Sequence, residues 1–340
     1  MMPRVSVVVV NLNGRSMLES CLSSLWRQNY SDFEVIVVDN GSCDGSIDFL
    51  GSIRDKRLKV VALPENIGFA AGCNAGIRVA AGQFIATLNN DAEVVPGWLG
   101  SLAAALEEEP ARGMCASKIL SATDHNRIDK VGHLIYMDGL NHGRGSGQLD
   151  IGQFDDPEEV LFPDAAAALY RRAMLDEIGL FDEKFFAYGD DADLGLRGRV
   201  AGWTCAYVPK AGVYHIHSAT AGKFSPLKAF LIERNRFWVA LKLFPLPLLF
   251  VTPVFTLVRF FFHAYGAIFM TGSSGQFAGE CSRRTLVLTI LKAYWSGLKS
   301  FGLMWRSRRE IRQFARINGT EFTRLLWQHR ISTKELTLGR

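Results

Sequence analysis

Two polar groups in this chain have residue types and spacings that suit catalysis. The first follows the apolar run Phe84–Leu88, which stops abruptly at Asn89, Asn90 and Asp91. The oxygens of Asn90 and Asp91 are hard donors, suited to a divalent cation that also binds phosphate oxygens. Asn and Asp also favour turns, so a simple turn at the end of a strand is the alternative interpretation.

The second group is the acidic stretch that begins with Asp190 and Asp191. Carboxylates favour the positive end of a helix dipole, and this accounts for Asp193, which can also pair with Arg197 one turn later. An adjacent acid pair is different, because like charges raise the pKa of one member and create a usable base. We therefore predict that the pair Asp190 and Asp191 supplies a catalytic base, with an acidic helix start as the structural alternative.

Histidines provide a third signal. In a strand, His215 and His217 would lie on the same face, and a neutral imidazole is a good ligand for Mn²⁺. We predict that His215 is a metal ligand, although a structural histidine pair would have the same pattern. Residues 138–156 are rich in Gly, Asp and Asn and are predicted to be a mobile loop over the site. His133 and His142 lie in or near it, and we expect both to be loop or surface residues.

The elements that must position these groups alternate between strands and helices. Val5–Val10, Glu34–Val38 and Phe84–Leu88 are apolar runs of strand length, and Leu58–Leu63 is a shorter one. Helical spacing of apolar residues lies between them, which predicts a parallel α/β sheet. Strands of such a sheet end at one edge, so Asp39 and Asp91 are expected to flank one crevice.

A glycine-rich turn, Asn66–Gly72, would enter the same crevice with free backbone N–H groups that suit a phosphate. A dinucleotide-binding fold is a competing interpretation. It is disfavoured because no GxGxxG motif follows the first strand.

Four motifs in order over residues 5–94 resemble those of family 2 glycosyltransferases, and further matches continue to about residue 245. The similarity is to the rhamnosyltransferase-like branch of that family, which builds cell-surface polysaccharides. The resemblance implies the GT-A fold. It is carried by Val7–Gly14, Val37–Ser46, Asn66–Asn74 and Leu88–Asp91.

By this resemblance, Asp39 would bind the pyrimidine base of a nucleotide sugar. Asp91 would ligate Mn²⁺ or Mg²⁺ as the last residue of the family's DXD-type motif, of which Asn89 replaces the first Asp. Asp190 would replace the Glu of the family's Glu-Asp pair and contact the acceptor, with Asp191 as the base. Further residues of these motifs are predicted to contact the substrates: Asn11, Asn13, Asn66, Gly68, Asn74 and Asn90.

The family pattern also has a His followed five positions later by Ser or Thr, which matches His215 and Thr220. Transfer would be a single displacement that inverts the anomeric carbon. Two other functions share parts of the pattern. A metal-dependent nucleotidyltransferase would not need the distant acid pair, and a non-catalytic scaffold would bind nucleotide sugars without turnover.

Charge is distributed unevenly along the 340 residues. Residues 221–340 contain 19 Lys and Arg against 5 Asp and Glu, whereas the rest of the chain is acidic. We predict a catalytic domain over 1–225, with a nucleotide-sugar half (1–95) and an acceptor half (96–225). Residues 226–340 are predicted to be a helical, membrane-associating region.

The apolar stretch 244–262 is long enough to span a membrane, but three prolines, Arg259 and His263 are expected to interrupt it. With the basic apolar stretch 286–309, it favours peripheral or shallow attachment to the cytoplasmic side of the inner membrane. Nucleic acid binding is disfavoured, because residues 1–220 are acidic overall and the sequence has no repeated pattern of aromatic and basic residues for stacking on bases. The donor is expected to be dTDP- or UDP-linked, and the acceptor a lipid-linked saccharide.

Overall fold

The computed structural model describes residues 2–216, 225–269 and 283–338. The chain divides into two compact units. The first comprises residues 1–133 and 143–220, and the second comprises 134–142 and 221–340. The short segment 134–142 therefore belongs to the same unit as the C-terminal helices, which the sequence pattern does not indicate.

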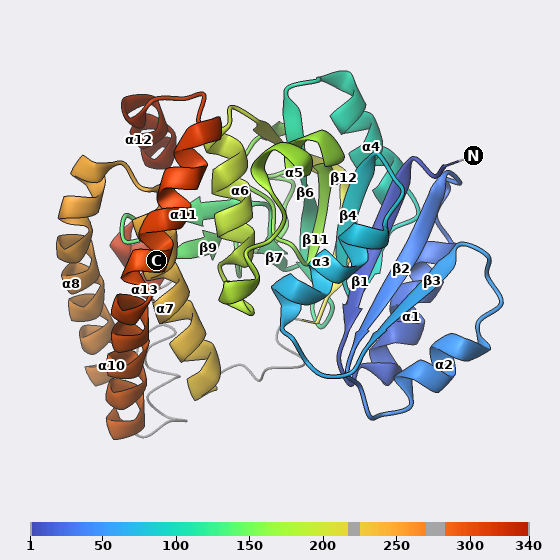
Figure 1. The fold of residues 1–340 in the computed structure, drawn as a ribbon, viewed down its shortest axis with the longest axis horizontal. Coiled ribbons are helices and arrows are strands. Elements are labelled where there is room, and N and C mark those ends of the chain that lie inside the picture. The colour runs from blue at the N-terminus through green and yellow to red at the C-terminus, as the bar shows by residue number, and fades with distance from the viewer. Residues whose placement is uncertain (1, 217–224, 270–282, 339–340) are drawn as a thin grey trace. The chain divides into compact units, whose positions relative to one another are not determined.

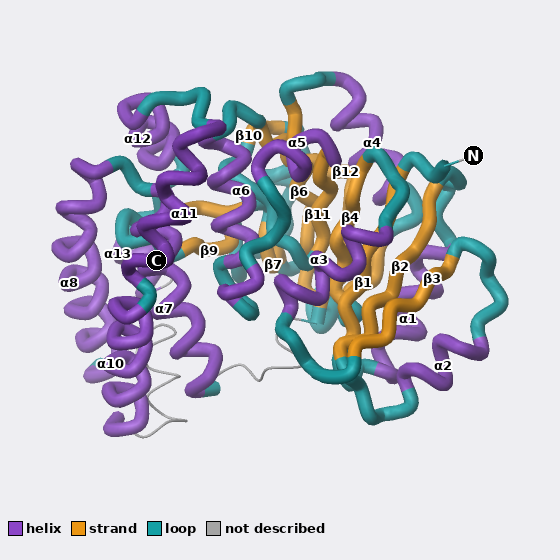
Figure 2. Tube along the Cα trace, in the orientation of Figure 1, coloured by secondary structure: helices purple, strands orange, loops and turns teal. Residues whose placement is uncertain are grey.

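The first unit is built on a ten-stranded mixed sheet (Figures 1 and 2). Its main path runs β10-β12-β6-β11-β4-β1-β2-β3, with β5 on β12 and β7 on β6. The part formed by β4, β1, β2 and β3 is parallel, and β11 joins it antiparallel to β4. The strands are β1 (Val5–Asn11), β2 (Phe33–Asn40), β3 (Leu58–Leu63), β4 (Phe84–Asn89), β5 (Ala92–Val94), β6 (Arg112–Ser121), β7 (Ile128–Lys130), β10 (Glu158–Glu159), β11 (Ala167–Arg171) and β12 (Thr204–His215). A separate two-stranded sheet pairs β8 (His133–Ile135) with β9 (Asn141–Gly143).

Helices cover both faces of the sheet, which explains why the central strands are almost wholly apolar. On one face, α1 and α4 pack against Val5, Val7 and Val9. On the other face, α3 packs against Val8 and Val38, where Gly76 permits close approach. The helices of this unit are α1 (Arg15–Trp26), α2 (Ser46–Ser52), α3 (Phe69–Val79), α4 (Trp98–Glu108), α5 (Arg172–Ile178), the 3₁₀ helix η1 (Glu183–Phe185) and α6 (Asp190–Val200).

The second unit is helical, as predicted. Within it α10 and α11 pack on α7, and α13 packs on α8. The buried Arg308 donates from Nη1 to the carbonyls of Leu241 and Phe244 at the end of α7, so part of the predicted basic run is structural. The helices are α7 (Pro226–Leu243), α8 (Leu246–Ile268), α10 (Arg283–Lys299), α11 (Phe301–Phe314), α12 (Gly319–Gln328) and α13 (Thr333–Leu338).

The prediction that prolines interrupt the apolar stretch 244–262 is wrong for most of its length. Helix α8 continues through Pro253, and Pro247 lies in its first turn, where proline is tolerated. By length and composition, α8 is the one helix among the described residues that could cross a membrane. Arg259 does not interrupt it, because its side chain is paired with Asp138 and Glu233 inside the second unit.

The predicted fold class is confirmed: a mainly parallel α/β sheet with flanking helices, followed by a helical region. The predicted strands over 5–10, 34–38, 58–63 and 84–88 all form. The region 138–156, predicted to be a mobile loop, contains β9 and begins with the fully buried Asp138.

The contact between α3 and the sheet is testable at Gly76. A Cβ there would lie 2.5 Å from Val8 Cγ1 and 3.0 Å from Val38 Cγ2. We expect Gly76→Ala to lower the free energy of unfolding by about 1–3 kcal/mol, although alanine favours helices. Urea unfolding followed by circular dichroism measures it.

Gly51→Ala is the matched control, because Gly51 is also helical and a Cβ there meets nothing within 4 Å. It should raise stability by about 0.4–1 kcal/mol. Equal changes in the two variants would contradict the packing argument.

Candidate active site

The carboxyl ends of β1, β2 and β4 bring three predicted site residues together. The parallel register places Asn11 beside Asp39 and Val10 beside Asn89. Asn11 Nδ2 donates to Asp39 Oδ1 at 3.0 Å, and Asn90 Nδ2 donates to Asn11 Oδ1 at 2.8 Å. Asp39 and Asn90 are therefore joined through the fully buried amide of Asn11.

Asn13 joins the loop after β1 to the loop after β2. Its main-chain N–H donates to Ser42 Oγ at 2.9 Å, and its Oδ1 accepts from the N–H of Cys43 at 2.9 Å. Asn13 has φ of 49°, a left-handed conformation that asparagine adopts more readily than most residues. The N–H of Ser42 in turn donates to Asp39 Oδ2 at 3.0 Å, so the two loops orient the Asp39 carboxylate.

The turn that begins at Asn66 is held by its own amide and by the loop before the acid pair. Asn66 Oδ1 accepts from the N–H of Gly68 at 2.9 Å. Gly68 has φ of +91°, and a Cβ there would lie 2.6 Å from the ring of Phe186. Phe186 and Tyr188 both have positive φ, 69° and 66°, a conformation that is costly for aromatic residues and typical of functional sites.

Asn74 has protein partners for both of its amide hydrogens. Its Nδ2 donates to Phe181 O and to Glu183 Oε1, each at 2.9 Å, and its Oδ1 accepts from the N–H of Phe181 at 3.1 Å. It therefore joins α3 to the segment before the acid pair. This differs from the predicted substrate contact, because the packing of α3 turns the side chain away from solvent.

His215 and Asp91 lie side by side, as their predicted metal role requires. Antiparallel pairing of β12 with β5 sets His215 opposite Ala92. His215 Nε2 lies 3.3 Å from Asp91 Oδ1 and 3.3 Å from Asn89 Nδ2. On the other side of the ring, Nδ1 lies 2.9 Å from Asp129 Oδ2. A carboxylate on the second nitrogen is the usual way in which a histidine ligand is oriented.

The charge of His215 depends on these two carboxylates. Burial by itself lowers the pKa of the imidazole, but hydrogen bonds with Asp129 and Asp91 raise its pKa to about 9. A protonated ring thus compensates the two acids at neutral pH. A bound cation would take over that charge after the proton has left, since metal ligands must be deprotonated.

The donor set of Asp91 and His215 fits Mn²⁺ or Mg²⁺. Asp91 Oδ1 is buried, and within the described residues it has no partner closer than the 3.3 Å contact with His215 Nε2. A cavity of about 260 Å³ lies beside it, lined in part by Ser20 and Tyr214. Two protein ligands leave positions for phosphate oxygens and water, which is how Mg²⁺ is usually bound with phosphates.

The acid pair starts α6, as predicted, and the Asp193–Arg197 pair is confirmed at 2.9 Å. Burial raises the pKa of Asp190 well above its ordinary value, and the charge of Asp191 raises it further. Burial also raises the pKa of Asp191, whereas the charge of His133 opposes that rise. Asp191, next to His133 and Lys130, is therefore the more readily ionised member of the pair.

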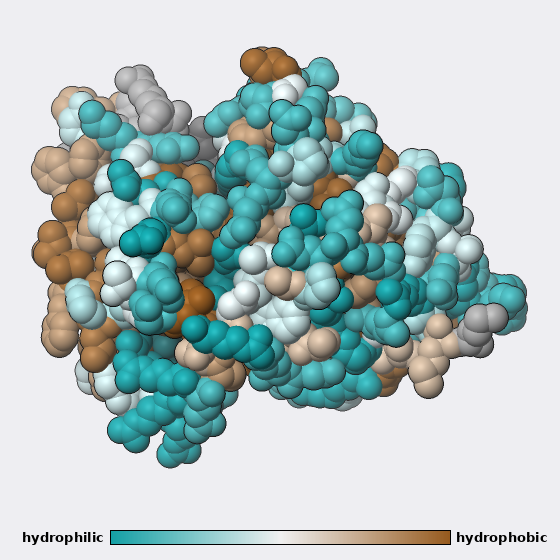
Figure 3. Space-filling model, turned by 90° about the horizontal axis from the view of Figure 1, so that it is seen from above, coloured by the Kyte–Doolittle hydropathy of each residue, from teal (hydrophilic) through white to brown (hydrophobic). Residues whose placement is uncertain are grey.

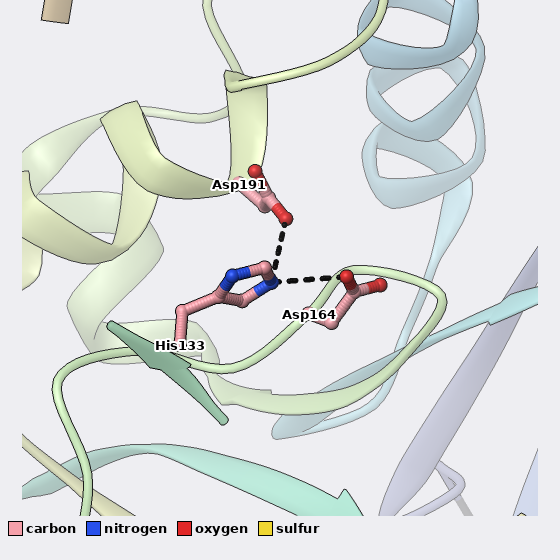
Figure 4. A group of neighbouring side chains, drawn as sticks. All are labelled: His133, Asp164 and Asp191. Carbon is pink, nitrogen blue, oxygen red and sulfur yellow. Dashed lines mark hydrogen bonds and ion pairs between the residues drawn. The ribbon is translucent and has the colours of Figure 1, made fainter. Parts of the chain in front are cut away.

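The expectation that His133 is a loop or surface residue is wrong. It is 5% exposed, and its ring stacks on Phe162 with centroids 5.0 Å apart. Its Nε2 lies 3.0 Å from Asp164 Oδ2 and 3.5 Å from Asp191 Oδ2 (Figure 4). The ring is turned inward because β8 is buried at this position.

Three further residues of the site have no sequence signal that would have identified them. Lys130 Nζ lies 2.9 Å from Asp164 Oδ2 and 3.7 Å from Asp129 Oδ2. Asp129 and Lys130 lie on the short β7, and Asp164 precedes β11, in segments without a periodic pattern. His217 and Thr220, which the sequence pattern also singled out, lie outside the described residues.

The mainly parallel sheet with flanking helices, and a site at the carboxyl edge of its strands, define an α/β protein of the GT-A fold. The family described as "Glycosyl transferase family 2" matches residues 6–179, just over half of the chain. The chain belongs to this family, which confirms the resemblance.

Several relatives have names from polysaccharide synthesis. The O-antigen biosynthesis protein RfbC of Myxococcus xanthus is 28% identical over 228 residues, covering 64% of this chain and 18% of RfbC. The N-acetylglucosaminyl-diphospho-decaprenol L-rhamnosyltransferase of Mycobacterium tuberculosis is 27% identical over 270 residues, covering 68% of this chain and 85% of that enzyme. The uncharacterized protein y4gI of Sinorhizobium fredii is 29% identical over 65% of this chain. The chain spans a quarter of y4gI and less than a fifth of RfbC.

Solved structures share the fold. GalNAc-T7 with UDP, GalNAc and Mn²⁺ superposes with a TM-score of 0.58 at 18% identity, covering 70% of this chain and 48% of that one. The mannosyltransferase PcManGT of Pyrobaculum calidifontis, in complex with GDP-Man and Mn²⁺, has a TM-score of 0.53 at 16% identity. It covers 92% of this chain and 86% of its own. The fold is therefore that of GT-A glycosyltransferases.

The metal donor set predicts how Mn²⁺ binding responds to substitution. Asp91→Asn should abolish measurable Mn²⁺ binding, because it removes the carboxylate ligand. Asp129→Asn should weaken binding by roughly 10- to 100-fold, since it removes only the group that orients His215. Calorimetric titration of Mn²⁺ in the presence of a nucleoside diphosphate measures both.

Asp48→Asn is the control, because it removes the same charge from an exposed side chain on α2 that does not line this cavity. Binding that is unchanged in Asp91→Asn would rule out this metal site.

Proposed function

We propose that the protein is an inverting, divalent-metal-dependent glycosyltransferase. It transfers a sugar from a dTDP- or UDP-linked donor to a hydroxyl of a lipid-linked saccharide. Rhamnose is the sugar suggested by the branch that the sequence resembles and by the name of the Mycobacterium relative. The product would belong to a cell-surface polysaccharide, consistent with the names of several relatives.

One observation carries this proposal: the metal pair and the acid pair belong to one continuous set of polar contacts. Starting from Asp91, each contact is between 2.9 and 3.7 Å long. Five strands and loops and one helix start thereby meet in a single site. The residues in order are Asp91, His215, Asp129, Lys130, Asp164, His133 and Asp191.

The donor side of the site is formed by Asp39 and the turn at Asn66. Each carboxylate oxygen of Asp39 accepts one protein hydrogen bond and has a lone pair left for the N–H of a pyrimidine base. Asn11 and Asn13 hold that carboxylate in orientation. A cation at Asp91 and His215 would stabilise the charge that develops on the departing diphosphate.

Asp191 performs the proton transfer in this proposal. Its carboxylate takes the proton of the acceptor hydroxyl as the hydroxyl oxygen forms a bond to the anomeric carbon. The bond between that carbon and the diphosphate oxygen breaks, and its electron pair leaves with the nucleoside diphosphate. One displacement from the opposite side inverts the anomeric configuration.

The assignment of the base is tested with Asp191→Asn. We expect loss of at least about 10²-fold in turnover, because an amide cannot accept the proton. Affinity for the nucleoside diphosphate should stay within about twofold, since Asp191 lies at the acceptor end. A coupled assay of nucleoside diphosphate release measures turnover, and calorimetry measures binding.

Asp176→Asn, on the exposed side of α5, is the control. Loss of both turnover and binding in Asp191→Asn would point to a folding role instead. Release of pyrophosphate by the unaltered protein would favour a nucleotidyltransferase, and binding without turnover on any acceptor would favour a scaffold.

We also propose that the helical unit attaches the protein to the cytoplasmic face of the inner membrane, without crossing it. The support is the two-sided character of α8. Its inner side carries Thr252, whose Oγ contacts the carbonyl of Met137, and Arg259, which pairs with Asp138. These polar contacts to a loop are unsuited to the bilayer interior.

The outer side of α8 carries an exposed apolar stripe, and α10 carries a second one. Figure 3 shows hydrophobic side chains gathered at the left edge of the molecule. Exposed basic residues follow or interrupt these stripes, an arrangement that suits the interface of an anionic bilayer. The apolar residues are Phe250, Val254, Leu257, Phe261, Val287, Leu291, Trp295 and Leu298, and the basic ones are Lys292, Lys299, Arg306 and Arg309.

Vesicle sedimentation tests this attachment. The protein should bind vesicles that contain phosphatidylglycerol, and less to those of phosphatidylcholine alone. Phe250→Ser combined with Phe261→Ser should weaken binding at least about tenfold, because burial of one such side chain is worth about 1.5–3 kcal/mol. Their side chains are 81% and 68% exposed.

Ile151→Ser is the control, an equally exposed apolar residue (82%) in the first unit. Equal binding by the double variant would contradict the proposed face. Protein that alkaline carbonate does not extract from membranes would indicate a true span.

A further inference from the structure

His133 occupies a position that its neighbours define closely. Its main-chain N–H donates to Phe162 O at 3.1 Å, and its ring stacks on the Phe162 ring at 16°. The Nε2 atom faces two carboxylate oxygens, those of Asp164 and Asp191 (Figure 4). Ionised carboxylates only accept hydrogen bonds, so Nε2 must carry a proton, which it donates to Asp164 at 3.0 Å while Asp191 lies 3.5 Å away.

Asp164 is a fixed partner for this imidazole. Its Oδ1 accepts the N–H of Ala166 at 2.7 Å, and its Oδ2 receives both His133 Nε2 and Lys130 Nζ. Burial alone would raise the pKa of Asp164, but Lys130 and His133 hold it well below its ordinary value. Asp164 is therefore a permanent acceptor that keeps the His133 ring in place.

A second metal ion is an alternative for this cluster, because the ligand atoms of His133, Asp164 and Asp191 lie within 4.8 Å of one another. Lys130 argues against it. Its ammonium group lies 2.9 Å from the same Asp164 oxygen that a cation would use. Burial lowers the pKa of Lys130, but Asp164 and Asp129 raise it above its ordinary value, so the positive charge is already present.

The Asp191 carboxylate lies between two donors. The N–H of Ala192 donates to its Oδ1 at 2.7 Å, and His133 Nε2 lies 3.5 Å from its Oδ2. The main-chain donor alone would allow the carboxylate to rotate about its Cβ–Cγ bond. The second contact restricts that rotation and so sets which lone pair points to the acceptor.

We propose that His133, held by Asp164, is a positioning residue that orients the Asp191 carboxylate for proton abstraction. The proposal rests on Asp191 being the base, as proposed above. His133 acts through Asp191 and does not itself exchange a proton with the substrate.

The charges around Asp191 agree with this role. Three groups that are negatively charged when deprotonated face Asp191. They are Asp190 on the same helix, Asp164 before β11 and the hydroxyl of Tyr170 on β11. His133 on β8 and Lys130 on β7 also face it, and they lower its pKa against the rise caused by burial. Removal of His133 should therefore raise the pKa of Asp191. The base works only when it is ionised. As the pH is lowered, turnover of a variant without His133 should therefore fall at a higher pH than turnover of the unaltered protein.

The test compares His133→Leu with His133→Gln. Leucine fills the space without a donor, whereas the glutamine amide can still donate to Asp164 and Asp191. We expect His133→Leu to lower kcat by about 10²-fold, the scale of a misplaced catalytic group, with the donor KM within about twofold. The acid limb of its kcat–pH profile should move to higher pH, and His133→Gln should recover most of kcat above that limb.

The proposal is wrong if folded His133→Leu keeps the kcat and acid limb of the unaltered protein, or if only the donor KM changes. It is also wrong if His133→Gln is as slow as His133→Leu and both variants keep the acid limb of the unaltered protein. That result would mean that His133 contributes only by packing. Thermal unfolding reports folding. Should His133→Leu not fold, Asp164→Asn replaces it, with the same loss of kcat expected and an unchanged kcat overturning the proposal.

Asp191→Asn in the same assay separates the two proposals. An inactive Asp191→Asn beside a fully active His133→Leu would end the positioning role and leave the function standing. An active Asp191→Asn would end the proposed function itself.

Discussion

Charge balance in a buried space is the constraint on which the candidate site depends. Four carboxylates from different elements lie close together with little access to water, and uncompensated buried charges are very costly. Positive or hydrogen-bonding groups alternate with them, so that His215, Lys130 and His133 each lie between two acids. Removing one of these three groups would leave the two carboxylates beside it without that partner. The charges at the metal end of the site and at the base end are therefore coupled. The four carboxylates are those of Asp91, Asp129, Asp164 and Asp191.

The sheet creates this crowding through a change of strand direction. The parallel part delivers Asp39 and Asn90 to its carboxyl edge, as open α/β sheets generally do. The antiparallel pairing of β12 with β5 then returns His215 to Asp91. Close contacts at glycines bring the remaining loops in, most clearly where Gly68 meets Phe186 ahead of the acid pair. The positive φ of Phe186 and Tyr188 shows that this loop is held in a costly shape next to the residues it positions.

The same balance of charge organises the second unit. Arg259 on α8 donates to Asp138 at 2.7 Å and to Glu233 at 2.8 Å, and Arg236 joins the same group. Burial would raise the pKa of Glu233, but the two arginines lower it to about 2. Helix α8 can thus contain Arg259 in its middle without interruption, because acidic side chains of the same unit neutralise the arginine charge while apolar side chains of the helix face outward. In the sequence alone, that arginine and the prolines indicated an interruption.

Local patterns in the sequence were sufficient to predict the sheet and the polar residues at the ends of its strands. Apolar runs of strand length indicated the sheet, and the polar residues that end them indicated Asp39 and Asp91. The acid pair stood out because adjacent like charges raise the pKa of one member. Each of these signals comes from a few neighbouring positions. Only the tertiary structure decided the rest. Asp129, Lys130, His133 and Asp164 come from short segments without periodicity, and their roles arise from partners more than thirty positions away along the chain. A pattern that is local in sequence cannot encode such contacts, because the position of each charge is set by the packing of strands that meet only in the folded protein.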